Sequence, residues 1–533
     1  MYLSEQGMKD QAFWNVKGYQ VPGFDRAEMI RGTREHPTWI HFGGGNIFRA
    51  FIADLAQQVL NQGIEKTGVI VASGRDSVTQ VYRPHDNLCL SVVLKPDGTV
   101  SKKVLGSIAQ SLVMGTECED WETLKWIFSQ NSLQMASFTI TEKAYKIKGM
   151  DGKYTPEVRK DFQKGWNCPQ SYMGKIAALC LERYRHGAPP MALVSMDNYS
   201  HNGLQLFESI RAYAHKWVEK GAVDAGFLEY VEDPRHLSFP WTMIDKITPS
   251  PDESVRRILE KDGVEGLGGV RTEKKTKSAV FVNAEETGYL IVEDSFPNGR
   301  PKLEKAGVIF TDRETVDKAE KMKVCTCLNP LHSALAIFGC LLGYTYIWKE
   351  MQDPDLLALI KKIGYEEGLP VVTDPGILDP KEFLDTVITE RFSNPFIPDS
   401  PQRIATDLSQ KIPIRFGKTL EAYVKDPMRD VSSLTYIPLV FAGYLRYLIG
   451  IDDKGQKMEI SPDPMKEILV KRMENIHLGE KKVPHRLIHS ILSNRQIFGY
   501  DLYQIGLGEK TEKYFQEMIQ APGAVRATLR RYL

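Results

Sequence analysis

The pattern of hydrophobic positions divides the chain into two parts of different character. From about Thr38 to Val292, short β-branched runs alternate with helical stretches, which is typical of an α/β domain. Two alternating runs joined by Pro-Asp-Gly predict an inserted β-hairpin near residues 87–106. Four further runs are predicted to form buried parallel strands, at residues 38–42, 68–72, 136–141 and 191–196.

The pattern changes after Lys323, where strand-like runs nearly vanish and long amphipathic segments take their place. The apolar run from Ser333 to Trp348 is shorter than the roughly 20 residues needed to cross a bilayer, so we interpret it as a buried helix. Proline and glycine interrupt the pattern at SFPNGRP, near residues 295–300. We therefore predict two domains, at residues 1–297 and 298–533, of which the second is all-α.

Composition favours a small-molecule partner. Among 533 residues, 68 Lys and Arg equal 68 Asp and Glu, so no overall field attracts nucleic acid or a membrane surface. The polar N-terminal segment lacks the apolar stretch of a secretory signal. Seven cysteines are too few for a disulfide framework and odd in number. We expect a cytoplasmic protein with reduced thiols, as monomer or homo-oligomer.

A glycine-rich turn lies between the first predicted strand and a helix, in TWIHFGGGNIFRAFIADLAQQVLNQG. Glycine lets backbone N–H groups approach a phosphate at the positive end of a helix, so this context predicts a Rossmann-like dinucleotide-binding domain with a parallel-rich sheet. The third glycine of G-x-G-x-x-G would fall at Phe48, so a turn without a ligand is the alternative. The candidate cofactor contacts are Gly43, Gly44, Gly45, Asn46 and Ile47.

The end of the second strand bears on the choice between NAD and NADP. An acidic residue there normally binds the ribose hydroxyls of NAD. In this chain Ser73 and Arg75 are suited to a ribose 2′-phosphate, because serine does not repel it and a guanidinium pairs with it. This slightly favours NADP. The alternative is that Arg75 is a solvated loop residue and that Asp76 binds the ribose of NAD.

Reactive residues gather just before the apolar helix, in AEKMKVCTCLNPLHSALAIFGCLLGY. A lysine among apolar side chains loses solvation, which favours its neutral form, so Lys323 is a candidate acceptor of a hydroxyl proton. Asn329 is a candidate donor to the developing alkoxide, and His332 a candidate for orienting the substrate. The alternative is a solvated lysine and a core histidine. Cys325, Cys327 and His332 raise a zinc site as another alternative, but they lack a fourth ligand and the usual C-x-x-C spacing, so we predict no metal.

Eight motifs in order resemble the polyol-specific long-chain dehydrogenases, the mannitol dehydrogenase family. The resemblance covers nearly the whole chain, and it implies a metal-independent oxidoreductase that transfers a hydride between NAD(P) and a secondary alcohol of a linear sugar acid or polyol. The motifs are FDRAEM, HFGGGNIFR, FTITEKAY (138–145), SMDNYSHNG (195–203), MIDKITP (243–249), VEDSFPNGRP (292–301), EKMK with LNPLHSALA, and RFSNPFIPD (391–399).

The resemblance assigns roles residue by residue. It makes Lys323, supported by Glu320, the catalytic acid/base, and makes Asn198 and Asn329 the amides that polarise the reacting oxygen. His332 orients the substrate. Glu142 corresponds to a glutamate that gates proton exchange, and Asp245 to a supporting aspartate. Arg403 and Lys411 correspond to basic residues that face the substrate.

The resemblance leaves the substrate open. We favour fructuronate and mannonate, because Arg403 or Lys411 can pair with a carboxylate. Mannitol 2-dehydrogenase activity and tagaturonate/altronate reduction are alternatives, as is a sugar-acid epimerase that keeps NAD bound. The basic pair is otherwise explained by surface pairing with acids such as Asp407.

The chain departs from the family near the catalytic lysine. Lys323 and Asn329 are six positions apart where the family usually has five, and Pro330 stands where the family tends to have glycine. A bulge or an altered turn must absorb the extra residue. Lys321 is the alternative base, although the spacing from Glu320 favours Lys323.

Overall fold

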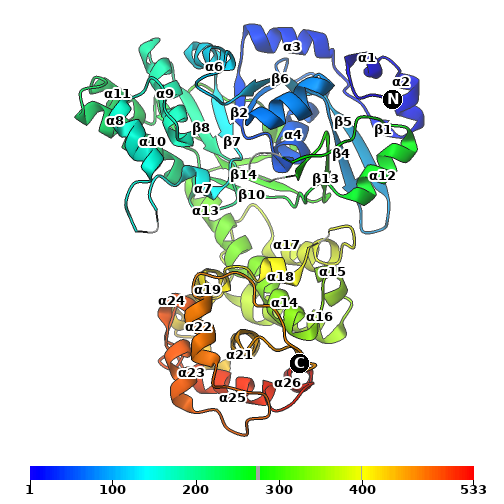
Figure 1. Ribbon diagram of the computed structural model, residues 1–533, viewed down its shortest axis with the longest axis vertical. Coiled ribbons are helices and arrows are strands. Elements are labelled where there is room, and N and C mark those ends of the chain that lie inside the picture. The colour runs from blue at the N-terminus through cyan, green and yellow to red at the C-terminus, as the bar shows by residue number, and fades with distance from the viewer. Residues whose placement is uncertain (150, 272–276, 398) are drawn as a thin grey trace. The chain divides into compact units, whose positions relative to one another are not determined.

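The computed structural model describes residues 1–149, 151–271, 277–397 and 399–533, and it separates into two compact units, Met1–Asp317 and Lys318–Leu533 (Figure 1). The first unit is α/β and the second is helical, which confirms the predicted fold class. The division falls later than the predicted residue 297. After the Pro/Gly segment the chain still forms β15 (Ile309–Thr311), which pairs in parallel with β14 (Tyr289–Glu293) in the first unit.

A six-stranded parallel sheet forms the centre of the first unit, in the order β6-β3-β2-β7-β8-β9. Alternate side chains enter two cores. Ile40 and Phe42 pack with the helices α6 (Asp120–Ser129), α9 (Tyr172–Arg185) and α10 (Asn202–Glu219), and Trp39 packs with α4 (Ala53–Asn61). Burial of both faces explains the continuous apolar runs, and all four predicted strands are confirmed. The strands are β2 Trp39–Phe42, β3 Val69–Ser73, β6 Ile108–Val113, β7 Met135–Phe138, β8 Met191–Ser195 and β9 Leu237–Ser238.

Smaller sheets flank the parallel sheet. The predicted hairpin is present as β4 (Cys89–Leu94) and β5 (Val100–Leu105), which pair antiparallel. This hairpin belongs to the sheet β1-β5-β4-β13, and a three-stranded sheet has the order β10-β14-β15. The remaining strands are β1 Tyr19–Gln20, β10 Thr242–Asp245, β11 Val270–Arg271, β12 Lys277–Ser278 and β13 Phe281–Ala284.

Helices cover the sheets of the first unit, with α3 and α4 near β6 and β2 in Figure 1. The bounds are α1 Glu5–Met8, α2 Gln11–Val16, α3 Arg26–Glu35, α4 Ala53–Asn61, α5 Arg75–Ser77, α6 Asp120–Ser129, α7 Glu142–Tyr145, α8 Pro156–Lys164, α9 Tyr172–Arg185, α10 Asn202–Glu219, α11 Gly226–Glu232 and α12 Glu253–Asp262.

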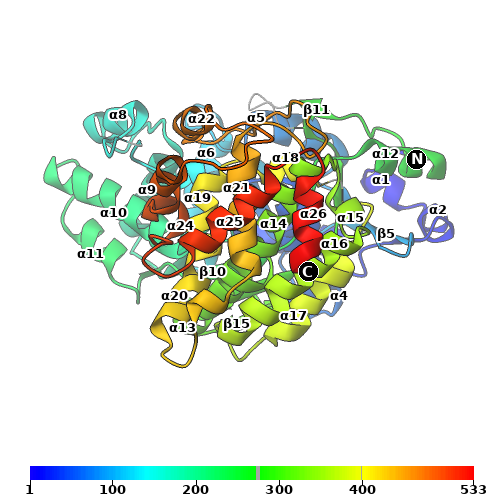
Figure 2. The same ribbon diagram turned by 90° about the horizontal axis from the view of Figure 1, so that it is seen from below.

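The second unit is built around α14 and α21, and α21 packs against both α14 and α25 (Figure 2). No strand occurs among its described residues. The division between the units falls within α13. The helices are α13 Arg313–Met322, α14 Asn329–Leu342, α15 Ile347–Glu350, α16 Pro354–Lys361, α17 Pro380–Thr386, α18 Pro401–Ile404, α19 Leu408–Arg415, α20 Gly417–Lys425, α21 Tyr436–Leu448, α22 Lys466–Met473, α23 His485–Leu492, α24 Arg495–Phe498, α25 Gly508–Met518 and α26 Ala524–Tyr532.

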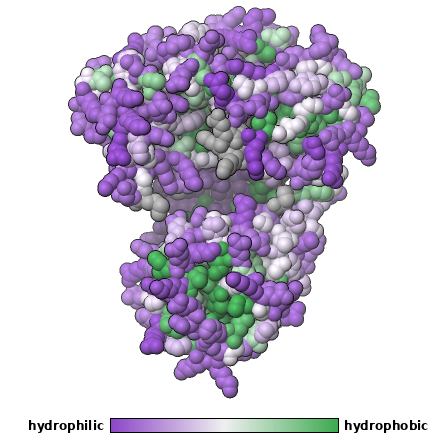
Figure 3. Space-filling model, viewed as in Figure 1, coloured by the Kyte–Doolittle hydropathy of each residue, from purple (hydrophilic) through white to green (hydrophobic). Residues whose placement is uncertain are grey.

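The buried helix predicted from the apolar run is α14, but it ends at Leu342 because Gly343, with φ +79°, adopts the left-handed conformation that terminates a helix. The stretch Arg313–Leu342 is the one described helical segment long and apolar enough to cross a membrane, and 83% of its apolar window is buried inside the structure. That burial is typical of a core helix. On the face seen in Figure 3, hydrophilic residues predominate over the first unit.

Candidate active site

The glycine turn after β2 contains one position that only glycine can fill without strain. Gly43 has φ +106°, and a β-carbon there would lie 2.2 Å from the carbonyl oxygen of Thr139. A β-carbon on Gly45 would meet nothing within 4 Å beyond its chain neighbours. The turn is therefore tightly packed at Gly43 and open at Gly45, as expected of a backbone that approaches a phosphate.

Hydrogen bonds tie this turn to the neighbouring strand β3. The N–H of Gly43 donates to the carbonyl of Ala72 at 2.8 Å, and the N–H of Gly44 donates to Oγ of Ser73 at 3.2 Å. The Tyr82 hydroxyl donates to the carbonyl of Gly44 at 2.8 Å. The structure thus brings together Gly44 and Ser73, two of the predicted cofactor contacts.

Phe48, at the position of the third motif glycine, packs beneath the turn. It is fully buried, and its ring stacks on His41 with 4.3 Å between centroids. His41 lies between the hydroxyls of Ser137 and Thr139, at 2.7 and 2.8 Å. Burial lowers the pKa of His41 to about 3, so the ring is a neutral part of the support. Sequence reasoning missed this residue, although a histidine within an apolar strand was a signal.

The helix after the turn begins at Asn46 and Ile47 and passes through a π-helical segment, Phe48–Ile52, before α4. The Asn46 side chain donates to the carbonyl of Pro249 at 2.9 Å and accepts from Arg49 at 3.1 Å. Asn46 is thereby fixed at the entrance of the helix.

Arg75 and Asp76 follow β3 in the first turn of α5. Arg75 is exposed, and its Nη2 donates to Sγ of Cys118 at 2.8 Å. Asp76 is half-buried and accepts a hydrogen bond from Gln80 at 3.3 Å. An exposed guanidinium near Ser73 suits a phosphate, and a carboxylate such as that of Asp76 is a suitable acceptor for a ribose hydroxyl. The geometry is compatible with NAD and with NADP.

The loop after β8 carries Asn198, and Asp197 fixes its start. Asp197 accepts from the N–H of Ile140 at 2.7 Å and from the Tyr145 hydroxyl, also at 2.7 Å. The Ser195 hydroxyl in turn donates to that of Tyr145 at 2.9 Å. Asn198 itself is exposed. Asp197 was missed from the sequence, although it adjoins Asn198 in the SMDN motif.

Glu142 begins the short helix α7 and is joined to the same network. Its carboxylate is exposed and pairs with Lys146 at 2.7 Å. The preceding Thr141 donates its N–H to Asp197 at 3.2 Å and has φ +72°, a strained value for a β-branched residue. Asp245 is buried at the end of β10.

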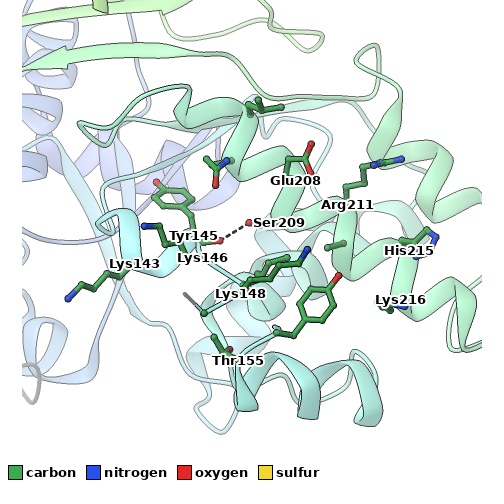
Figure 4. Close-up of a pocket in the computed structure, with 16 residues that line it drawn as sticks. Lys143, Tyr145, Lys146, Lys148, Thr155, Glu208, Ser209, Arg211, His215 and Lys216 are labelled. Carbon is green, nitrogen blue, oxygen red and sulfur yellow. Dashed lines mark hydrogen bonds between the residues drawn. The ribbon is translucent and has the colours of Figure 1, made fainter. Parts of the chain in front are cut away.

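A cavity of about 1030 Å³ lies beside α7 in the first unit (Figure 4). Figure 4 shows the Ser209 hydroxyl of α10 bonded to the carbonyl of Tyr145, at 2.7 Å, which joins α10 to α7. Lys143, Lys146 and Lys148 line the cavity, and the predicted site residues do not. The cavity therefore does not belong to the candidate site.

Lys323 in the second unit opens a π-helical turn, Lys323–Cys327, between α13 and α14. The N–H of Leu328 donates to the carbonyl of Lys323 at 3.1 Å, which is the i to i−5 bond of a π-bulge. Such a bulge holds one residue more than an α-helical turn, so the predicted bulge is confirmed. Lys323 is 1% exposed, whereas Lys321 is exposed and lines a separate cavity of about 300 Å³.

His332 lies on the first turns of α14 and belongs to an ionic cluster. Its Nε2 lies 3.1 Å from Oδ2 of Asp399, and its ring lies against Phe392 with 5.0 Å between centroids. Burial lowers the pKa of His332, although the hydrogen bond to Asp399 opposes the shift. A neutral His332 donates through Nε2 and keeps Nδ1 as an acceptor for a substrate hydroxyl.

Arg403 shares the same carboxylate, with its Nε 2.7 Å and its Nη2 2.6 Å from Oδ1 of Asp399. Lys411 is half-buried and donates to the carbonyl of Ile404 at 3.1 Å. Burial and the charge of Arg415 lower the pKa of Lys411 to about 8. Asp399 thus connects His332 and Arg403. The sequence did not indicate this role, although Asp399 is the last residue of the RFSNPFIPD motif.

Arg415 was also missed. Its Nη1 donates to the carbonyl of Asn329 at 3.3 Å and to the Ser333 hydroxyl at 2.7 Å. Burial lowers the pKa of Arg415 to about 10. A cation is therefore placed directly beside Asn329.

The alternative zinc site has no support in the geometry. Among the described residues, no group of three or more His, Cys, Asp or Glu side chains is placed to hold a metal ion. Cys325 and Cys327 are buried and form no disulfide, and burial raises the pKa of Cys327 to about 12, which disfavours the thiolate ligand.

Comparison of the sequence with known protein families identifies its relatives. The family model for the mannitol dehydrogenase Rossmann domain matches residues 37–305, and that for the mannitol dehydrogenase C-terminal domain matches residues 315–519. The chain belongs to the mannitol dehydrogenase family. This family member is 50% identical to the D-mannonate oxidoreductase of Thermotoga maritima over 533 residues, which are 99% of this chain and 98% of that protein.

Two further relatives extend the comparison of this mannitol dehydrogenase family member. A polyol:NADP oxidoreductase of Gluconobacter oxydans is 28% identical over 449 residues, 83% of this chain and 85% of that protein. The solved ternary complex of Pseudomonas fluorescens mannitol 2-dehydrogenase with NAD and D-mannitol is 25% identical with a TM-score of 0.73, and the match covers 100% of this chain and 99% of that one. The resemblance seen in the sequence is confirmed: the protein is a nicotinamide-dependent oxidoreductase of polyol or sugar-acid alcohols.

Proposed function

We propose that this enzyme interconverts D-mannonate and fructuronate, its keto acid. The observation that carries the proposal is the set of cations on α18 and α19, namely Arg403, Lys411 and Arg415, of which the last is bonded to Asn329. A carboxylate substrate requires such partners, and a neutral polyol does not. The 50% identity to a D-mannonate oxidoreductase agrees with this choice.

The glycine turn suits the cofactor, because Gly45 leaves space for a pyrophosphate at the start of a helix. When bound there, a nicotinamide cofactor would supply the acceptor for the hydride of the alcohol carbon, or the donor of a hydride to the ketone. Ser73 and Arg75 give a slight preference for NADP, and Asp76 is the alternative ribose contact for NAD. The absence of a disulfide among the seven cysteines, all of which the structure describes, is consistent with a cytoplasmic enzyme.

The chain's own residues handle the proton and the oxygen. Lys323, neutral before oxidation, accepts the hydroxyl proton as the C–H electron pair leaves the same carbon, and it returns that proton during reduction. The amides of Asn329 and Asn198 donate to the oxygen while negative charge develops on it. Nδ1 of His332 accepts from a substrate hydroxyl. Glu142 and Asp245 have supporting roles in proton exchange and positioning.

The variant Lys323→Ala tests the acid/base assignment. We expect kcat to fall by about 10²- to 10⁴-fold, with cofactor affinity nearly unchanged and partial rescue by added small primary amines. Lys321→Ala is the matched control, since Lys321 is exposed and two positions away. Stopped-flow and steady-state absorbance at the NAD(P)H band measure turnover. Full turnover by Lys323→Ala, or collapse of Lys321→Ala alone, would overturn the assignment.

A further inference from the structure

Arg415 ends α19 and lies against the first turn of α14. Its two acceptors, the Asn329 carbonyl and the Ser333 hydroxyl, are both neutral. The N-terminal end of a helix carries partial positive charge, so it repels a guanidinium and attracts an anion. A half-buried cation at this place is therefore unfavourable by itself.

The nearby carboxylate does not neutralise Arg415. Both oxygens of Asp399 are engaged, Oδ1 by Arg403 and Oδ2 by His332. Among the residues that the structure describes, no Asp or Glu forms an ion pair with Arg415, and its charge depresses the pKa of neighbouring Lys411. The three cations Arg403, Lys411 and Arg415 have two carboxylates near them, Asp399 and Asp407, so the cluster holds surplus positive charge.

Arg415 also has unused donors. Both of its described hydrogen bonds are made by Nη1. Nε and Nη2 make none, and they are not among the fully buried nitrogens that lack a partner, so both are accessible to solvent or to a ligand. Two parallel N–H donors in a fixed plane match the two oxygens of a carboxylate. The exposed edge of Arg415 is therefore a ready-made carboxylate site next to Asn329.

We propose that Arg415 binds the substrate carboxylate and determines the preference for sugar acids over neutral polyols. This inference rests on the proposed function of the same site. It differs from the assignment of Arg403 as the carboxylate partner, because Asp399 already satisfies the charge of Arg403. Arg415 acts as a specificity residue: it distinguishes substrates by their end group and takes no part in proton transfer.

The test compares D-mannonate with D-mannitol, which has the same chain length and a hydroxymethyl group in place of the carboxylate. For Arg415→Gln we expect kcat/KM for D-mannonate to fall about 10- to 100-fold, and mannitol oxidation at high substrate concentration to change less than about threefold. Arg415→Lys should recover part of the loss for D-mannonate, since it restores the charge without the planar pair of donors.

Lys418→Gln is the matched control. Lys418 is an exposed cation on α20 that pairs with Glu421, and its loss should leave kcat/KM for both substrates unchanged. An equal fall in kcat/KM for both substrates in Arg415→Gln would show that Arg415 only positions Asn329. Wild-type kcat/KM for both substrates would show that Arg415 does not contact the carboxylate. Either result overturns the inference. A wild-type enzyme that oxidises mannitol but no sugar acid would instead refute the proposed function, and the inference with it.

Discussion

The open space at Gly45 predicts that one methyl group can weaken cofactor binding without harming the fold. In Gly45→Ala the added β-carbon meets nothing within 4 Å, and φ is not in the left-handed region, so the free energy of unfolding should be unchanged or rise by about 0.4–1 kcal/mol. We place the cofactor phosphate against this open side of the turn, where the same methyl group would obstruct its approach to the backbone N–H groups. Loss of one charge-assisted hydrogen bond, about 1.5–3 kcal/mol, raises Kd roughly 10- to 100-fold.

Gly43 gives the opposite result at the same turn. A β-carbon there would be 2.2 Å from Thr139 O and 2.8 Å from Thr139 C, both backbone atoms that cannot rotate away. The φ of +106° adds about 1–3 kcal/mol of strain for alanine. Gly43→Ala should therefore lower both the melting temperature and the cofactor affinity, whereas Gly45→Ala lowers only the affinity.

Fluorescence titration with NADH and NADPH measures Kd, and differential scanning calorimetry measures stability. Gly32→Ala is the control, because Gly32 lies within α3 and its β-carbon would also meet nothing within 4 Å. We expect that variant to gain up to about 1 kcal/mol of stability with wild-type Kd. Wild-type affinity in Gly45→Ala would refute the reasoning and favour a glycine turn without a ligand.

Two further changes test separate features. Arg75→Ala should raise KM for NADP about tenfold or more and leave KM for NAD unchanged. Arg257→Ala, which removes an exposed arginine of α12, is the control. Equal effects on KM for both cofactors would exclude a contact between Arg75 and the 2′-phosphate. Glu350 is fully buried, its two oxygens have no partner among the described residues, and burial raises its pKa well above the usual value. The folded state then holds a proton that the unfolded state releases, so stability falls by about 1.4 kcal/mol per pH unit between the unfolded and folded pKa values. Glu350→Gln should lack this slope in thermal unfolding between pH 5.5 and 7.5; an identical slope in both proteins would show that Glu350 is ionised.

The sequence predicted most of the first unit because its strands are buried on both faces. Residues such as Ile40 and Trp39 point into different cores, so each strand is a continuous apolar run that can be recognised without tertiary information. The later domain division could not be read in the same way. β15 has only three residues, and its place in the first unit depends on pairing with β14, a contact that no local pattern encodes.

The site residues divide along the same line. Gly43 and Lys323 belong to local motifs, so the sequence alone is enough to propose them as site residues. His41 and Arg415 were missed because a buried histidine and an arginine at a helix end have no distinctive sequence pattern. The supporting role of His41 follows from its contact with Ser137, and the charge that Arg415 adds to the site follows from its contact with Asn329. Charges brought together by folding are the part of a site that sequence spacing conveys least.

The extra residue between Lys323 and Asn329 shows what local reasoning can and cannot reach. Counting positions was enough to predict that something must absorb it. An insertion spread along the helix would rotate every later side chain by about 100°, and α14, in which every residue from Ser333 to Leu341 is buried, would have to repack on all sides. Confining the insertion to one π turn, closed by the bond from Leu328 to Lys323, leaves the buried side chains of α14 in their places. Burial of α14 therefore selects the bulge, and the bulge in turn sets where Lys323 stands relative to Asn329.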